Sequence, residues 1–328
     1  MSQKPCPTEF QSIEVRSFEP ELLFEAVAGG GFDQKLLCGG LFHARLDRVV
    51  LPNSRLDRGN YNLPCIGHGS IPEGWVGIGM TDSPWKRPWI NGIEVNDHQV
   101  QFYAEGCPID YRCSINAPWF LLQVRRDYLQ RTAIATFGRE LEIPTHWMLN
   151  TDVPCQSGRA LLDRVEWFFG IGVGIADGPK LLELAESKLI VTACRALFSG
   201  QPSIDGRTLK ATERKLGLIR QLDHAFREEL TKAFAMQELS NKTGLKVRNL
   251  GDAIQRIYGV SPRELFEVHR LHQIRRELIG LSQEVVSIGL LASKYGFTNA
   301  SRFSNRYAKL FGEKPTETLR RTRKLAGL

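Results

Sequence analysis

Two predicted helices in the C-terminal third carry guanidinium, amide and hydroxyl groups along one face. Their apolar residues recur at helical spacing, so the remaining positions face outward. In the first helix the outward side chains include Arg248, Asn249, Asp252 and Arg256. In the second helix they are Ala300, Ser301, Arg302, Asn305, Arg306 and Lys309. Arginine can donate two hydrogen bonds to guanine, and asparagine can pair with adenine in the major groove. These faces therefore have the chemistry to read the bases of DNA.

Both helices belong to an internal repeat. The first copy has the pattern Met236-x-x-Leu239-Ser240-x-x-x-Gly244-Leu245, and 52 residues later the second copy has Ile288-x-x-Leu291-Ala292-x-x-x-Gly296-Phe297. Four further positions recur with an offset of 53, from Leu250, Ile254, Gly259 and Pro262 to Phe303, Tyr307, Gly312 and Pro315. Each copy predicts a helix, a break at a glycine and a second helix, which is the helix-turn-helix arrangement. A generic pair of helices would share this spacing but would not need the polar outer face.

A single helix is predicted between the two units. It begins at Pro262 and runs to about Ile279, a length of about 27 Å. Two units held at its ends could enter successive major grooves, which lie about 34 Å apart on one side of the duplex. Thr298 is the expected N-cap of the second recognition helix, because its hydroxyl can accept a backbone hydrogen bond.

The charge distribution agrees with a polyanionic partner. Residues 214–328 contain 22 Lys+Arg and 11 Asp+Glu, a net charge of +11, whereas residues 1–213 contain 21 and 25, a net charge of −4. A basic segment on an acidic body indicates nucleic-acid binding, although it can also serve solubility alone. Hydrophobic residues make up 42% of the chain and no apolar run has the length of a membrane span, which predicts a globular protein.

The first half has the pattern of a β-rich domain. Short apolar runs lie between turn residues, as in a barrel or sandwich; they are Leu36–Leu51, Trp75–Met80, Val100–Tyr103 and Phe120–Val124. Asn91-Gly92 predicts a tight hairpin, and the apolar spacing becomes helical from about Ser157. We therefore expect an α+β chain with a β-rich domain at 1–156, a helical segment at 157–198, a linker at 199–213 and an all-α DNA-binding domain at 214–328.

The repeat resembles the C-terminal domain of the AraC/XylS family of bacterial transcription regulators. The resemblance covers residues 214–325. Around the second unit it is carried by Ile288, Leu291, Ala292, Gly296, Phe297, Ser301, Phe303, Tyr307, Phe311, Gly312 and Pro315, and in the connecting helix by Ser261, Pro262, Arg270 and Leu271. It implies two helix-turn-helix units, and it implies that the N-terminal half is a cupin-like regulatory barrel followed by dimerising helices.

This resemblance also implies a function. The expected protein is a cytoplasmic homodimer that binds double-stranded DNA of the bacterial nucleoid and acts as a transcription activator through RNA polymerase. We expect no catalytic residue, no cofactor and no bound metal.

The first unit departs from the family pattern more than the second does. Ala235 and Lys246 stand where the family has capping side chains, and Asp252 would repel DNA phosphates, although it can accept a hydrogen bond from cytosine. In this unit Arg248 and Asn249 are the better candidates for base contacts.

Aromatic residues of the β-rich half are candidates for an effector site. The four proposed are Trp75, Trp89, Tyr103 and Tyr111. The alternative is that they only fill the core of the domain, as aromatic residues commonly do. A metal site built from His43, His68 and His98 is disfavoured, because these residues lack the close spacing of a cupin metal site.

Two alternative functions stay open at this point. One is a cupin-type metal enzyme that carries a DNA-binding domain. The other is a DNA-binding regulator that responds to no small molecule.

Overall fold

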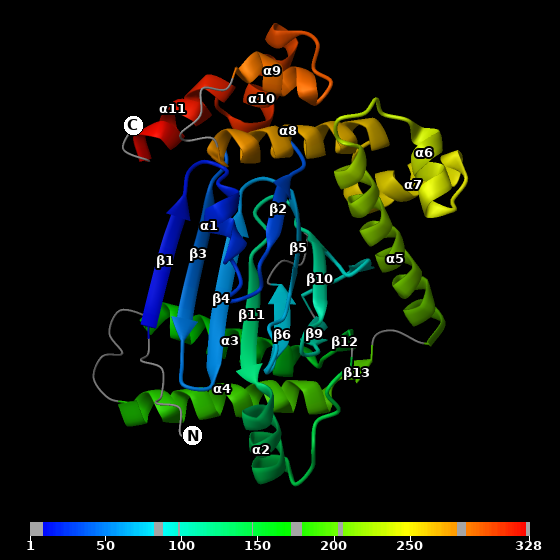
Figure 1. Ribbon diagram of the computed structural model, residues 1–328. Coiled ribbons are helices and arrows are strands. Elements are labelled where there is room, and N and C mark those ends of the chain that lie inside the picture. The colour runs from blue at the N-terminus through cyan, green and yellow to red at the C-terminus, as the bar shows by residue number, and fades with distance from the viewer. Residues whose placement is uncertain are drawn as a thin grey trace.

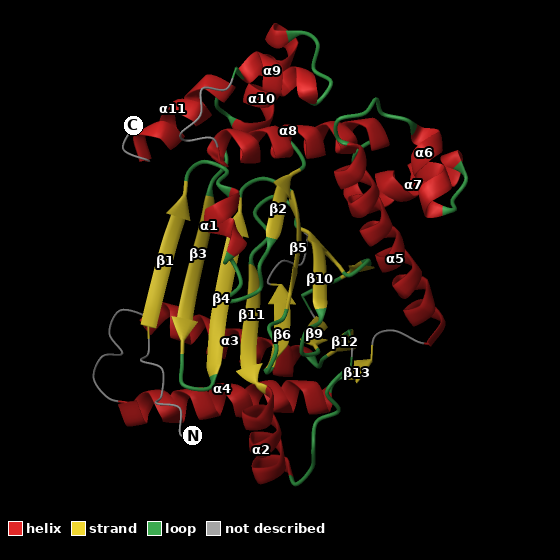
Figure 2. Ribbon diagram, in the orientation of Figure 1, coloured by secondary structure: helices red, strands yellow, loops and turns green. Residues whose placement is uncertain are grey.

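The computed structural model describes residues 9–81, 88–97, 99–145, 147–171, 179–202, 206–280 and 287–325. A β-rich domain occupies the centre of the molecule, and the C-terminal helices lie across one end of its strands (Figure 1). Two helices cross the other end of the strands (Figure 2). The expected order, β-rich first and helical afterwards, is confirmed.

Two antiparallel sheets make up the β-rich domain. The larger has the order β1 (Glu9–Val15), β3 (Ala44–Val50), β4 (Ser54–Tyr61), β11 (Trp119–Arg125), β6 (Trp75–Thr81), β9 (Gln99–Tyr103), β12 (Met148–Asp152) and β13 (Gln201–Pro202). The smaller has the order β2 (Asp33–Leu36), β5 (Cys65–Ser70), β10 (Pro108–Arg112), β7 (Trp89–Ile90) and β8 (Ile93–Glu94). The run Leu36–Leu51 is therefore not one strand, because its two ends lie in different sheets.

The hairpin expected at Asn91-Gly92 is confirmed. Asn91 has φ +50° and Gly92 has φ +77°, and they join the paired strands β7 and β8. Positive φ at both central residues matches the twist of the flanking strands, and asparagine and glycine are the residues that adopt it most easily.

The two helices expected after the β-rich region are α3 (Cys155–Ile171) and α4 (Pro179–Ser199). Their apolar faces share one core with strands of the larger sheet. Glu186 of α4 is buried and accepts hydrogen bonds from the backbone of Asn53 (2.9 Å) and the hydroxyl of Ser54 (2.7 Å). These bonds join α4 to the turn between β3 and β4.

Two further helices lie in the region where only strands were expected. They are α1 (Pro20–Phe24) and α2 (Arg126–Phe137). The second follows β11 directly and buries only Leu129 and Ala133. Such a narrow apolar face gives a weak periodic signal in the sequence.

Seven helices are described in the C-terminal part, within residues 206–280 and 287–325. They are α5 (Gly206–Glu229), α6 (Met236–Thr243), α7 (Val247–Tyr258), α8 (Pro262–Gly280), α9 (Ile288–Lys294), α10 (Ala300–Phe311) and α11 (Pro315–Leu325). Since α5 begins at Gly206, the break after α4 is shorter than the linker expected at 199–213. Within the described ranges every helix is too short or too polar to cross a lipid bilayer.

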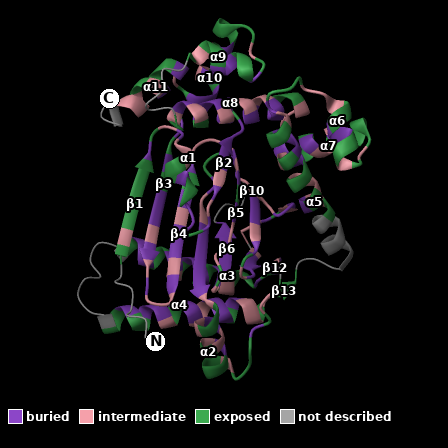
Figure 3. Cartoon of the chain, in the orientation of Figure 1, coloured by how far each residue is buried: buried purple, intermediate pink, exposed green. Residues whose placement is uncertain are grey.

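One apolar core runs through both parts of the chain. It joins Phe18 and Phe42 of the β-rich domain to Ile274 of α8 and Phe311 of α10. Figure 3 shows that the side of α8 facing the sheets is buried. The connecting helix is thus packed on the β-rich domain.

Candidate nucleic-acid interface

The two predicted units have the same local construction. Gly244 (φ +68°) is the C-cap of α6, and Gly296 (φ +79°) follows Tyr295, the C-cap of α9, so each turn contains a left-handed residue that favours glycine. In the first unit the hydroxyl of Ser240 donates to the carbonyl oxygen of Leu245 (2.6 Å), which closes the turn. Each turn is followed by a second helix, α7 or α10.

The predicted faces of α7 are confirmed. Its apolar residues Leu250, Ile254 and Ile257 are buried. Its polar candidates are exposed: Arg248, Asn249, Asp252 and Arg256. The helix therefore packs by one side and presents its polar groups to solvent.

Helix α10 has the same arrangement with one exception. Its apolar residues Phe303, Tyr307 and Leu310 are buried. Five candidates are exposed: Ala300, Ser301, Arg302, Asn305 and Lys309. Arg306 is only partly exposed and forms an ion pair with Glu267 of α8. This guanidinium is thus engaged within the protein.

The N-cap of α10 differs from the one expected. Helix α10 begins at Ala300, so the residue before it is Asn299, not Thr298. The Asn299 side chain accepts a hydrogen bond from the backbone of Arg302 (2.8 Å), which is the usual bond of an N-cap. Ala235 and Lys246 make no side-chain cap bond, as their types predict.

Helix α8 separates the two units. Its start is a capping box, in which Ser261 N donates to Glu264 (2.9 Å) and Glu264 N donates to the Ser261 hydroxyl (3.3 Å). Its 19 residues give a length of about 28 Å. This matches the length expected for the connecting helix.

Arg275 of α8 is fully buried. The sequence motifs do not indicate a special role for it. Its guanidinium donates to Phe18 O (2.9 Å), Tyr307 Oη (3.2 Å) and Thr318 Oγ1 (3.3 Å), and it pairs with Glu313 (2.7 Å). One side chain thus joins the β-rich domain to α8, α10 and α11. No local sequence pattern distinguishes it from the other basic residues of this region.

A groove of about 650 Å³ adjoins the start of α10. Four arginines line it: Arg263, Arg270, Arg302 and Arg306. Arg270 is held by the carbonyl oxygen of Leu230 (2.8 Å), whereas Arg263 and Arg302 are exposed. Positive charge is therefore concentrated beside the exposed face of α10.

Helices α7 and α10 both contact the β-rich domain at their C-terminal ends. The Arg112 guanidinium donates to the carbonyl oxygen of Ile257 in α7 (2.8 Å). At α10, the chain at Gly39 lies so close that a Cβ atom there would stand 1.9 Å from the Lys309 carbonyl oxygen. Only a glycine can therefore occupy position 39 with this packing.

The four candidate effector residues do not share one site. Trp75 is buried, with the guanidinium groups of Arg55 and Arg125 4.2 and 4.8 Å from its ring centroid. Tyr103 and Tyr111 line an interior cavity of about 80 Å³. Trp89, the fourth candidate, lines a different cavity.

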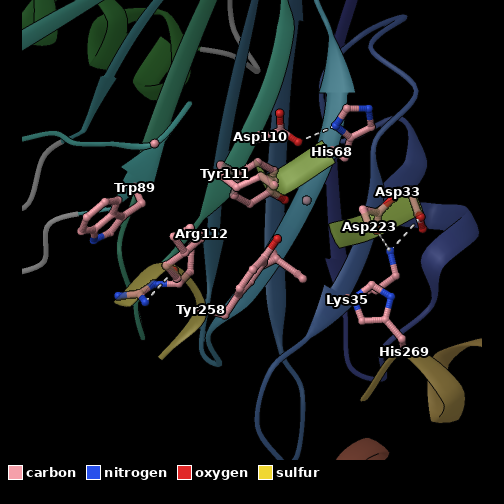
Figure 4. A pocket seen from close by; sticks show the side chains of 15 residues that line it. Asp33, Lys35, His68, Trp89, Asp110, Tyr111, Arg112, Asp223, Tyr258 and His269 are labelled. Carbon is pink, nitrogen blue, oxygen red and sulfur yellow. Dashed lines mark hydrogen bonds and ion pairs between the residues drawn. The ribbon is translucent and has the colours of Figure 1, made fainter. Parts of the chain in front are cut away.

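That second cavity lies between β10 and the C-terminal helices and has a volume of about 50 Å³. Figure 4 shows Trp89, Tyr111 and Arg112 along one side of it, with Tyr258 and His269 from the helical part. Tyr111 is therefore the candidate common to both cavities.

The structure describes two of the three histidines considered for a metal site. His43 is exposed, and His68 Nδ1 lies 2.5 Å from Asp110, a hydrogen bond that raises the pKa of His68. His98 lies outside the described residues. Among the described residues no three His, Cys, Asp or Glu side chains are grouped so that they could hold a metal ion.

Comparison with known proteins identifies the C-terminal part. Residues 239–321 match the model of a family described as a helix-turn-helix domain. The XylDLEGF operon transcriptional activator of Pseudomonas putida is 30% identical over 146 residues, which are 44% of this chain and 40% of that protein. Another protein of that organism, XylDLEGF operon transcriptional activator 3, is 29% identical over 94 residues, 29% of this chain and 28% of that protein.

Solved structures also match. A probable AraC family transcriptional regulator from Rhodopseudomonas palustris CGA009 is 29% identical, with a TM-score of 0.31 over 33% of this chain and 98% of that one. The AraC-like transcriptional activator CuxR is 13% identical, with a TM-score of 0.42 over 80% of this chain and 94% of that one.

The chain spans about two fifths of the length of the first curated relatives it matches. The family model includes α7, α8, α9 and α10 in full, so it covers the elements that carry the exposed polar faces. The C-terminal part of this chain therefore matches a helix-turn-helix domain family, and the resemblance to AraC/XylS regulators expected from the sequence is confirmed over this part.

Proposed function

We propose that this chain is a sequence-specific DNA-binding transcription regulator whose helices α7 and α10 enter adjacent major grooves. The observation that carries the proposal is the division of both helices into a buried apolar face and an exposed polar face, at either end of one packed helix. A recognition helix needs this division, because one side must be anchored while the other contacts base edges.

The residues have different roles in this proposal. Arg302 and Asn305 contact bases, since both are exposed on α10 and have side chains that pair with guanine and adenine. Arg248 and Asn249 do the same from α7, and Lys309 contacts phosphate. Asp252, Arg256, Ala300 and Ser301 lie on the same exposed faces and complete the interface.

Arg306 has a conditional role. Its guanidinium pairs with Glu267 in the free chain, and the ion pair has to open before the group can reach a base. In the free chain, we therefore propose, Arg306 holds α10 against α8. It contacts DNA only in the complex, after the ion pair has opened.

The proposed protein is a homodimer that forms through α3 and α4. Supporting this, Leu181 and Leu184 of α4 are 59% and 53% exposed, and Trp167 of α3 is 36% exposed. Large apolar side chains on a surface commonly mark an interface. The domain boundaries that we propose are 1–156, 157–198, 199–213 and 214–328, with the refinement that α5 begins within the third range.

We further propose that the protein activates transcription in the cytoplasm of a bacterium, on nucleoid DNA and together with RNA polymerase. The Pseudomonas putida relatives are named as operon transcriptional activators, which supports activation rather than repression. An effector would bind at Tyr111, because this residue lines both cavities of the β-rich domain. A regulator without an effector is the alternative, and a screen of metabolites for a rise in Tm separates the two, since a ligand of the folded state raises stability.

The experiment that tests the function is selection of bound sequences from a random DNA pool, followed by titration of the selected site and a scrambled site. We expect the selected site to bind about 10³-fold tighter or more at physiological salt, as specific DNA-binding proteins do. Equal affinity for both DNAs would refute sequence-specific binding.

A further inference from the structure

Cys65 and Cys113 stand opposite each other on neighbouring strands of the smaller sheet. Strands β5 and β10 are antiparallel, and Ile66 pairs with Arg112, so the next pair in the register is Cys65 with Cys113. The backbone of Cys113 donates to the Cys65 carbonyl oxygen (2.9 Å). Their two Sγ atoms lie 3.0 Å apart, and both thiols are free.

This placement meets the geometric requirement for a disulfide bond. A disulfide needs Cα atoms about 4.4–6.8 Å apart, and opposite residues of antiparallel strands have Cα atoms about 4.5–5.5 Å apart. The side chains already point toward each other, so the sulfur atoms can reach bonding distance without a change of strand register.

Both residues are buried, with 1% of Cys65 and 4% of Cys113 exposed. Cys113 lines a groove of about 730 Å³ between the β-rich domain and the end of α7. A hydrogen bond from the Cys65 thiol lowers the pKa of Cys113, and the Cys65 backbone N–H also donates to its sulfur (3.4 Å). Burial raises the pKa of Cys65 well above its usual range.

The other described cysteines do not combine a facing thiol with a lowered pKa. Burial raises the pKa of Cys107 and of Cys194 to about 12, and it also raises the pKa of Cys38. Since the thiolate is the nucleophile in thiol oxidation, the raised pKa values keep these three thiols in the protonated, less nucleophilic form. Cys155 is exposed, and among the described residues the thiol–thiol contact is between Cys65 and Cys113.

We infer that Cys65 and Cys113 are an oxidation site at which hydrogen peroxide forms a reversible disulfide bond. The Cys113 thiolate attacks one peroxide oxygen, the O–O bond breaks, and the departing hydroxide takes up a proton to give water and a Cys113 sulfenic acid. The Cys65 sulfur then attacks the Cys113 sulfur, the S–O bond breaks, and the leaving hydroxide takes the Cys65 proton. Two thiols and one peroxide become one disulfide and two waters.

The site lies next to the contact between the β-rich domain and the first recognition helix. Arg112, which precedes Cys113, is the residue that binds the end of α7. The inference concerns the chemistry of the two thiols and does not depend on DNA binding.

The test uses the full chain, reduced, freed of reductant and treated with a small excess of hydrogen peroxide in the folded state. We expect the intact mass to fall by two hydrogen atoms, and peptide mapping without reductant to find Cys65 linked to Cys113. Dithiothreitol should reverse both changes. A Cys113 link to Cys38, or an unchanged intact mass with both thiols still free, would overturn the inference.

Variants separate the roles of the two residues. Cys65→Ser leaves the Cys113 sulfenic acid without a thiol to attack it, so dimedone should label Cys113 in this variant. Cys113→Ser should abolish both the label and the link, whereas Cys194→Ser should oxidise like the parent. Because Cys65→Ser places a hydroxyl in the core, Cys65→Ala is a second variant with the same expected label. Labelling of Cys38 or Cys155 in place of Cys113 would contradict the assigned order of attack.

Discussion

The guanidinium of Arg112 donates a hydrogen bond to the carbonyl oxygen of Ile257, a residue 145 positions later in the chain. The acceptor belongs to the last turn of α7, where backbone carbonyls lack helical partners and the helix dipole favours a cation. A side chain of the β-rich domain thus completes the end of the first recognition helix. This bond therefore ties α7 to the smaller sheet, in which the neighbouring Tyr111 lines both cavities.

Substitution of Arg112 should loosen this contact. In Arg112→Ala the last carbonyls of α7 lose a charged donor, and we expect their turn to open about tenfold more often, equal to about 1.4 kcal/mol. Hydrogen exchange of the α7 amides measures this change. Arg126→Ala is the matched control, because Arg126 pairs with Glu105 away from α7 and its loss should leave that exchange unchanged. Unaltered exchange in Arg112→Ala would show that the contact does not stabilise α7.

Substitution of Arg302 should weaken binding to specific DNA more than binding to non-specific DNA. Its side chain is exposed at the start of α10, and we expect Arg302→Ala to weaken binding to the selected site by about 1–3 kcal/mol, with little effect on scrambled DNA. Fluorescence anisotropy at fixed salt measures both affinities. Arg320→Ala, at an exposed position of α11, should lower the affinity for both DNAs by the same factor. Equal losses on both DNAs in Arg302→Ala would make Arg302 a phosphate contact.

The N-cap of α10 gives a stability prediction. Asn299→Ala removes the acceptor of the Arg302 backbone N–H, and the free energy of unfolding should fall by about 0.5–2 kcal/mol. Urea unfolding measures the change. Thr298→Ala, one residue earlier, should have a smaller effect, since it leaves that bond intact. The opposite order of the two effects would restore Thr298 as the N-cap.

Asp33 should make the stability of the chain depend on acid pH. Burial alone would raise its pKa, but Lys35, Arg276 and Arg227 together lower the pKa of Asp33 to about 2. A carboxyl with a lowered pKa stabilises the fold above its unfolded pKa of about 4, and this stabilisation, about 2 kcal/mol, is lost as the pH falls toward 2.

Unfolding by urea at a series of pH values measures this contribution. Asp33→Asn should be less stable than the parent at pH 7, and the difference should shrink as the pH falls from about 4 to about 2. Asp127→Asn, in an exposed pair with Arg131, is the control that should keep the parent profile. A difference that is constant with pH would show that the carboxylate charge is not the cause.

The proposed dimer interface on α4 is tested by charge insertion. Leu181→Glu with Leu184→Glu places two carboxylates on the exposed apolar face, and the protein should become monomeric because like charges of the two copies would then meet. Light scattering after size-exclusion chromatography gives the mass. Leu290→Glu, at a 73% exposed position of α9, should remain a dimer. A dimer that persists in the double variant would place the interface elsewhere.

The sequence was sufficient to predict the elements that repeat. The repeat predicted the helix pairs α6–α7 and α9–α10, and the Asn91-Gly92 pair predicted the hairpin of β7 and β8, because each of these patterns lies within one short segment. The N-cap was missed by one residue, since Thr298 and Asn299 are both capable caps and only the helix start decides between them.

Contacts between the two parts of the chain could not be predicted in this way. The Arg275 bond to Phe18 joins residues 257 positions apart, and neither residue carries a periodic signal for the other. The facing thiols of Cys65 and Cys113 likewise depend on the register of β5 with β10. Such pairs become visible only when the strands and helices are placed in space.

We propose that α7 and α10 of one chain read adjacent major grooves. Hydroxyl-radical and methylation-protection footprinting of the parent protein on its selected site tests this directly. We predict two protected major-groove segments on one face of the duplex, about 34 Å apart for each chain. In Arg302→Ala the contacts of one segment should weaken while the other persists. A single protected segment for each chain, or protection that does not depend on sequence, would show that the two helices do not read adjacent grooves.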